Sequence, residues 1–66
     1  MGFLVYWVRE KGQVYFPVKE MARDTDGNLT EQMAYGADAL PLDEANTLFE
    51  RFSQTFPERE FFVLPV

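Results

Sequence analysis

The chain has 66 residues and a net charge of −5, with no cysteine and no histidine. This length predicts a single domain over residues 1–66. The lack of cysteine excludes a disulfide framework and thiolate metal sites, and the lack of histidine removes the commonest catalytic base and metal ligand. We therefore expect a protein that is not an enzyme, with no catalytic residues, no metal and no cofactor. No stretch approaches the roughly 20 apolar residues of a membrane helix, so we expect a cytoplasmic protein that does not bind membranes.

Two strands are predicted near the N-terminus. Residues 3–9 and 14–18 are rich in β-branched and aromatic side chains, which favour strands. The connection Glu10-Lys11-Gly12-Gln13 predicts a hairpin, in which Gly12 is free to take a positive φ. Pro17 cannot donate to a ladder, so the second strand is expected to be an edge strand or to carry a bulge.

A turn is predicted at Asp24-Thr25-Asp26-Gly27-Asn28. A calcium loop is not expected, because Leu29 and Tyr35 stand where such a loop needs glycine and glutamate. If residues 19–23 prolong the second strand, residues 29–35 return as a third strand. A short helix over residues 30–35 is the alternative.

Residues 41–55 are predicted to form a helix. The apolar residues of this segment recur at the spacing of one helical stripe, namely Ala45, Leu48, Phe49, Phe52 and Phe56. Pro41 suits a helix start and Pro57 ends the helix. Residues 60–66 form a last strand, which ends at Pro65.

The predicted fold is α+β with the order ββ(β)αβ. It has a small, mostly antiparallel sheet of three or four strands with one helix packed on one face. Two strands before the helix allow the last strand to run antiparallel to the first, whereas three make the two parallel through a right-handed crossover.

The first and last strands are apolar on both faces, although one helix covers only one face. A possible self-association face therefore comprises Leu4, Tyr6, Val8, Phe62 and Leu64. Three occupants remain open for this face. Residues 21–40 fold over it with Met21, Leu29, Met33 and Leu40, or a second copy covers it as a homodimer, or another partner does.

The acidic residues are concentrated between residues 24 and 50, a stretch without lysine or arginine. The predicted partner-binding residues are Asp24, Asp26, Glu31, Asp38, Asp43, Glu44 and Glu50. These carboxylates form either a solvated face or an imitation of a phosphate backbone that enters a basic groove. Direct nucleic-acid binding is not expected, because Arg9, Lys11 and Lys19 are too few to form a basic surface. Carboxylate catalysis by Asp43/Glu44 or Glu58/Glu60 is disfavoured, since a helix N-terminus explains the first pair.

The chain resembles the small acidic anti-CRISPR proteins of phages and mobile elements. The resemblance lies in its size, the acidic stretch 24–50, the absent catalytic residues and the element order that ends in Phe61-Phe62-Val63-Leu64-Pro65-Val66. It implies an inhibitor that binds a CRISPR effector subunit in a bacterial host and blocks target-DNA recognition or cleavage. A self-associating structural or accessory module of phage or bacterial origin is the alternative.

Overall fold

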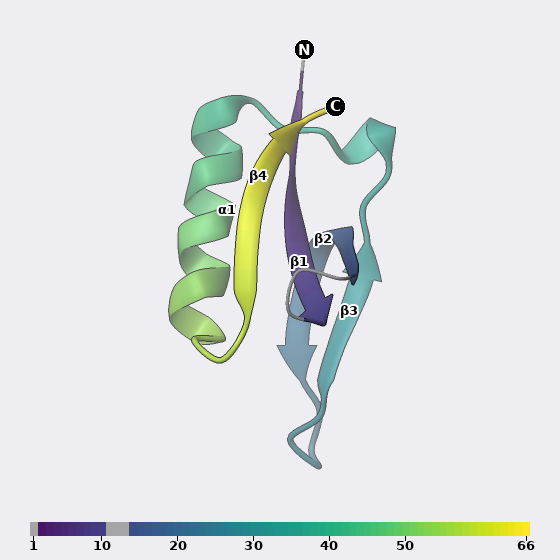
Figure 1. The fold of residues 1–66 in the computed structure, drawn as a ribbon, viewed down its shortest axis with the longest axis vertical. Helices are drawn as coiled ribbons and strands as arrows, with labels where there is room; N and C mark the ends of the chain where they lie inside the picture. The colour runs from purple at the N-terminus through teal and green to yellow at the C-terminus, as the bar shows by residue number, and fades with distance from the viewer. Residues whose placement is uncertain (1, 11–13) are drawn as a thin grey trace.

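The computed structural model describes residues 2–10 and 14–66 and shows one antiparallel sheet and one α-helix (Figure 1), which confirms the predicted α+β class. The expected conformation of Gly12 lies outside the described residues. The sheet has the strand order β3-β2-β1-β4. Its elements are β1 (Phe3–Glu10), β2 (Val14–Arg23), β3 (Leu29–Met33), the short 3₁₀ helix η1 (Gly36–Asp38), α1 (Leu42–Thr55) and β4 (Glu60–Pro65).

The third strand is present, so the helix considered for residues 30–35 is wrong. The turn before it follows the predicted chemistry: Gly27 has φ of 84°, and Asp24 Oδ1 accepts hydrogen bonds from the backbone N–H groups of Asp26 and Asn28, both at 2.9 Å. The strand ends at Met33 rather than at residue 35, because η1 begins directly afterwards.

A β-bulge at Lys19 changes which side chains of β2 face the core. Val18 pairs with Met33 and Glu20 pairs with Gln32, so Lys19 is an extra residue in the ladder. Side chains alternate along a strand, and one extra residue reverses the alternation. Val18 and Met21 therefore both point into the same core.

The bulge confirms one of the two expectations from Pro17, while the other is wrong because β2 is a central strand. The backbone N–H and C=O groups of Phe3 both bond to Leu40, on the side of β1 where β2 lies. Successive residues of a strand direct these groups to alternate sides, so those of Tyr6, three residues later, point toward β4. Pro17 lies opposite Tyr6 and needs no N–H toward β1.

Beyond the bulge, β2 and β3 form an arm that folds onto the same face of β1 and β4 as α1. Met21 belongs to the buried cluster of Phe52, Phe56 and Phe61, and Leu29 packs against that cluster. At the end of the arm, the Arg23 guanidinium lies 5.4 Å from the centre of the Phe56 ring. The core is thus closed by α1 and by the arm together.

The last strand runs antiparallel to the first, so the parallel crossover expected for three preceding strands is wrong. The reason is a sharp bend of β2 at the bulge. The first half of β2 runs antiparallel to β1, its second half turns back, and β3 therefore runs toward the end of the sheet where β1 begins (Figure 1). Leu40 then pairs antiparallel with Phe3. The chain therefore reaches the end of the sheet where β1 begins, α1 runs down the sheet, and β4 returns along β1 (Figure 1).

The amphipathic stripe of α1 is confirmed. Ala45 and Phe52 are fully buried, while Leu48 and Phe49 are half-buried against the core. Pro41 is the N-cap residue, and its carbonyl accepts from the Ala45 N–H at 2.9 Å. Within the described residues, no helix is both long and apolar enough to cross a membrane.

The second face of β1 and β4, turned away from α1, is not covered as one expectation had it. Met21 and Leu29 pack on the helix side because of the bulge, and Met33 is 37% exposed. Of the four residues expected to cover the second face, Leu40 alone remains, and it extends the sheet beside Phe3.

We predict that Met21→Ala lowers the free energy of unfolding by about 2–5 kcal/mol, because the bulge places this side chain in the core. Met33→Ala is the matched control and should change it by less than about 0.5 kcal/mol. Urea unfolding of both variants measures the difference. Equal effects of the two substitutions would show that the arm does not close the core.

Candidate functional site

The seven acidic residues predicted to bind a partner do not form one continuous surface. Asp24 and Asp26 lie in the β2–β3 turn at the lower end of the molecule in Figure 1, whereas Asp43 and Glu44 lie in the first turn of α1 at the upper end. The others are distributed between these ends, with Glu31 in β3, Asp38 in η1 and Glu50 in α1.

Two of the seven carboxylates hold local structure. Asp24 closes the β2–β3 turn with its two backbone hydrogen bonds. Asp38 Oδ2 accepts from the Tyr35 N–H at 2.9 Å, and its Oδ1 lies 3.6 Å from Lys19 Nζ. Asp38 therefore connects η1 to the bulge of β2. Because its charge is paired with Lys19, it is poorly suited to bind a positively charged partner.

Three carboxylates, Asp43, Glu44 and Glu50, are exposed on α1 and form what we call the acidic surface of α1. Among the described residues none of the three has an ion-pair partner. Arg51 is the base nearest in sequence, but its guanidinium lies over the Phe52 ring, 5.4 Å from the ring centre. The rise from Asp43 to Glu50 is about 10.5 Å, which matches about three base-pair steps of a DNA strand.

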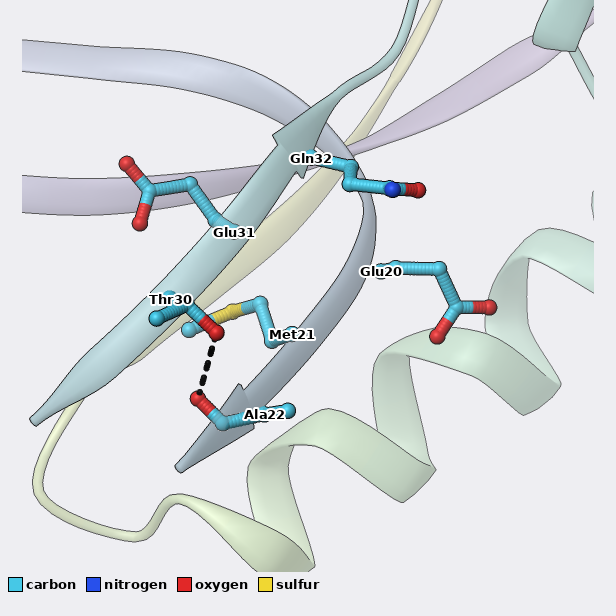
Figure 2. A pocket seen from close by; sticks show the side chains of 6 residues that line it. All are labelled: Glu20, Met21, Ala22, Thr30, Glu31 and Gln32. Carbon is cyan, nitrogen blue, oxygen red and sulfur yellow. Dashed lines mark hydrogen bonds between the residues drawn. The ribbon is translucent and has the colours of Figure 1, made fainter. Parts of the chain in front are cut away.

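A hollow of about 440 Å³ lies on the arm, lined by Glu20, Met21, Ala22, Thr30, Glu31 and Gln32. Figure 2 shows that Glu20 and Gln32 point to one side of the arm, whereas Glu31 points to the other. The Thr30 hydroxyl donates a hydrogen bond to the Ala22 carbonyl oxygen at 3.3 Å (Figure 2). Because its two carboxylates diverge, the hollow does not place an acid and a base on opposite sides of a bound molecule.

A smaller hollow of about 210 Å³ lies where β1 ends and β4 begins, and it is lined by Val8, Arg9, Glu58, Arg59 and Glu60. The Glu58 carboxylate accepts from the Arg23 guanidinium and forms an ion pair with it. That contact holds the pKa of Glu58 below the ordinary glutamate value. Glu58 is therefore an ionised structural partner of Arg23 rather than a proton donor. In the described part of the chain, no group of three or more acidic side chains is arranged to hold a metal ion.

Three aromatic rings form a cluster on the second face, which we call the aromatic face: Tyr6, Tyr15 and Phe62. Tyr6 and Phe62 lie directly opposite each other on β1 and β4, with their rings nearly parallel and their centres 5.4 Å apart. Tyr15 meets both rings edge-on, at 5.8 Å from Tyr6 and 5.2 Å from Phe62. Such pairs stabilise the sheet. Tyr15 nevertheless keeps 52% of its surface exposed.

The remaining predicted residues of this face differ in exposure. Leu4 and Val8 are buried, and Leu64 is 39% exposed. Only the at least partly exposed side chains of this face could contact a partner, namely Tyr6, Tyr15, Phe62 and Leu64. Leu4 and Val8 are buried within the protein.

All four arginines lie over aromatic rings of the helix side. Besides Arg23 over Phe56 and Arg51 over Phe52, Arg9 lies over Phe16 at 6.0 Å and Arg59 over Trp7 at 5.3 Å. The arginines thus border the core on one side of the sheet. Within the part of the chain that the structure describes, no arginine lies over a ring of the aromatic face.

No protein family, no curated protein and no solved structure matches the chain.

Sequence reasoning missed Tyr15 and Glu20. Tyr15 joins the aromatic face because it pairs with Val8, two positions from Tyr6. The hairpin spacing carried this signal, since it sets the register of β2 on β1. Glu20 lies outside the base-free stretch and so was not grouped with the other acids.

We predict that NMR titration places the pKa of Glu58 below its ordinary range, and that Arg23→Gln raises it toward that range. Because the pKa is lowered in the folded state, the stabilisation is present above the ordinary pKa of about 4.3 and is lost as pH falls through the folded-state pKa. Glu58→Gln should therefore destabilise the protein at pH 7 and have no effect in strong acid. Glu50→Gln, which removes an exposed carboxylate from the middle of α1, is the control for stability. A Glu58 pKa that Arg23→Gln leaves unchanged would contradict the assignment.

Proposed function

We propose that the protein is a non-enzymatic binding protein, an inhibitor whose acidic surface occupies a basic nucleic-acid-binding site of another protein. The observation that carries this proposal is the acidic surface of α1, where Asp43, Glu44 and Glu50 are exposed and unpaired among the described residues. A helix held by Ala45 and Phe52 in the core presents these charges rigidly, so binding does not require ordering of the surface.

The charges of the whole protein fit a cationic partner. The net charge of −5 attracts a basic groove at a distance and repels free nucleic acid. Lys19 forms an ion pair with Asp38 and Arg23 with Glu58, so the two ion pairs between described side chains leave Asp43, Glu44 and Glu50 without a basic partner.

The partner class follows from this chemistry. A protein that binds DNA or RNA through a lysine- and arginine-lined groove is the expected partner, and a CRISPR effector subunit in a bacterial cytoplasm belongs to that class. The acidic surface of α1 is narrower than the seven-residue face expected from the sequence, so α1 is the contact element of the proposal.

The triple variant Asp43→Lys, Glu44→Lys and Glu50→Lys tests the proposal. A partner captured from a bacterial lysate by the wild-type protein is identified, and its affinities for the protein and for nucleic acid are measured by competition. We expect the triple variant to bind about 100-fold or more weakly, since each close charge pair contributes on the order of 1 kcal/mol or more.

The matched control carries the same change of net charge at places outside α1, as Glu20→Lys, Asp26→Lys and Glu31→Lys. We expect it to retain most of the affinity if α1 makes the contact. The proposal fails if both triple variants weaken binding equally, or if nucleic acid does not compete with the wild-type protein. Thermal unfolding establishes that both variants are folded.

A further inference from the structure

The aromatic face is a surface separate from the acidic surface of α1, and its chemistry is different. From its geometry we infer that it binds an arginine side chain carried by an exposed segment of another protein. The inference goes beyond the proposed function, because it involves no residue of α1.

The rings of this face are arranged to receive a planar cation. Tyr6 and Phe62 are parallel within 7°, and Tyr15 stands at 74° and 68° to them. Tyr15 therefore stacks on neither ring, and 52% of its surface is exposed. A guanidinium stacks on such a surface and is more weakly hydrated than an ammonium, so arginine is preferred over lysine.

A carboxylate borders the rings. Glu60 is exposed, pairs with Val8 and precedes Phe62 by two positions, so strand alternation directs its side chain to the same face. Arg9 and Arg59 share the hollow beside Glu60, but their guanidinium groups are held over Phe16 and Trp7 on the helix side. A cation that binds to the second face would thus contact aromatic rings and a carboxylate. Among the described residues, no arginine of this chain occupies that place.

A second copy of the chain is the less suitable occupant. All four arginines already lie over rings of their own chain, so a copy would have to give up one of these contacts to offer an arginine. A standard interface buries about 800 Å² on each partner, roughly a sixth of the 4563 Å² surface of this protein. Three aromatic side chains of about 150–250 Å² each, two of them already half-buried, fall short of that area.

The test uses a short peptide of alternating arginine and glycine and a peptide of the same length in which citrulline replaces arginine. Citrulline keeps the shape of arginine and removes its charge. The ring resonances of Tyr6, Tyr15 and Phe62 are followed by NMR while each peptide is added at physiological salt. We expect saturable shifts of these resonances with the arginine peptide and none with the citrulline peptide.

Variants then locate the site. Tyr15→Ser should weaken binding of the arginine peptide about two- to fivefold, the range expected for one exposed cation–π contact. Tyr35 is 68% exposed and lies outside the aromatic face, so Tyr35→Ser is the control and should leave binding unchanged. Glu60→Gln should weaken binding without changing the fold.

Three results would overturn the inference. Equal shifts with both peptides would indicate apolar docking, and ring shifts that depend on protein concentration alone would indicate a second copy. Equal weakening by Tyr15→Ser and Tyr35→Ser would indicate unspecific attraction to an acidic protein. Because no α1 residue is changed, failure here leaves the proposed function standing, and failure of the α1 charge reversals leaves this inference standing.

Discussion

The extra residue at Lys19 in β2 is the constraint on which the rest of the structure depends. It reverses the alternation of the strand, so that both Val18 and Met21 face the same core. Without this reversal Met21 would point to the second face and the arm of β2 and β3 could not close the core. The bulge is held by a neighbour in space, since Lys19 itself pairs with Asp38 of η1. The bend of β2 at the bulge also turns β3 toward the end of the sheet where β1 begins, so that α1 and β4 can follow the sheet (Figure 1).

The closed core decides how charge is distributed on the surface. With α1 and the arm on one face, the rings of Trp7, Phe16, Phe52 and Phe56 border that side, and the four arginines lie over them. A small domain gains stability from such contacts, because it buries a limited apolar area. The carboxylates of α1 and the aromatic face remain at the surface, and these are the two places where we propose that positively charged groups bind.

Local pattern was sufficient to predict the elements. The helical stripe through Ala45 and Phe52, the aspartate–glycine turn at Gly27 and the strand composition of β1 and β4 each depend on neighbours along the chain, and all are present in the structure. The path of the chain depends on contacts distant in sequence. The bend of β2 at Lys19 and the contact of Arg23 with Phe56 leave no periodic signal, which is why the sequence left the direction of β4 open and did not fix the side of the sheet on which Met21 packs.

In the candidate site too, features set by neighbours along the chain were predicted, and features set by contacts distant in sequence were not. Exposure of Asp43, Glu44 and Glu50 follows from the helical period and was accessible to sequence reasoning. Their separation from Asp24 and Asp26 was not, because it is set by the course of the arm. The engagement of Asp38 with Lys19 likewise joins residues on different elements, and it removes one acid from the set that a partner meets.

The most direct test of the fold-back arm is an NMR measurement of proton–proton contacts between its residues and the helix side of the core. We expect nuclear Overhauser contacts from the Met21 methyl group to the Phe52 and Phe56 rings, and from the Arg23 side chain to the Phe56 ring. Contacts of Met21 with Tyr6 or Phe62, together with none from Arg23 to Phe56, would place the arm on the second face and contradict the account.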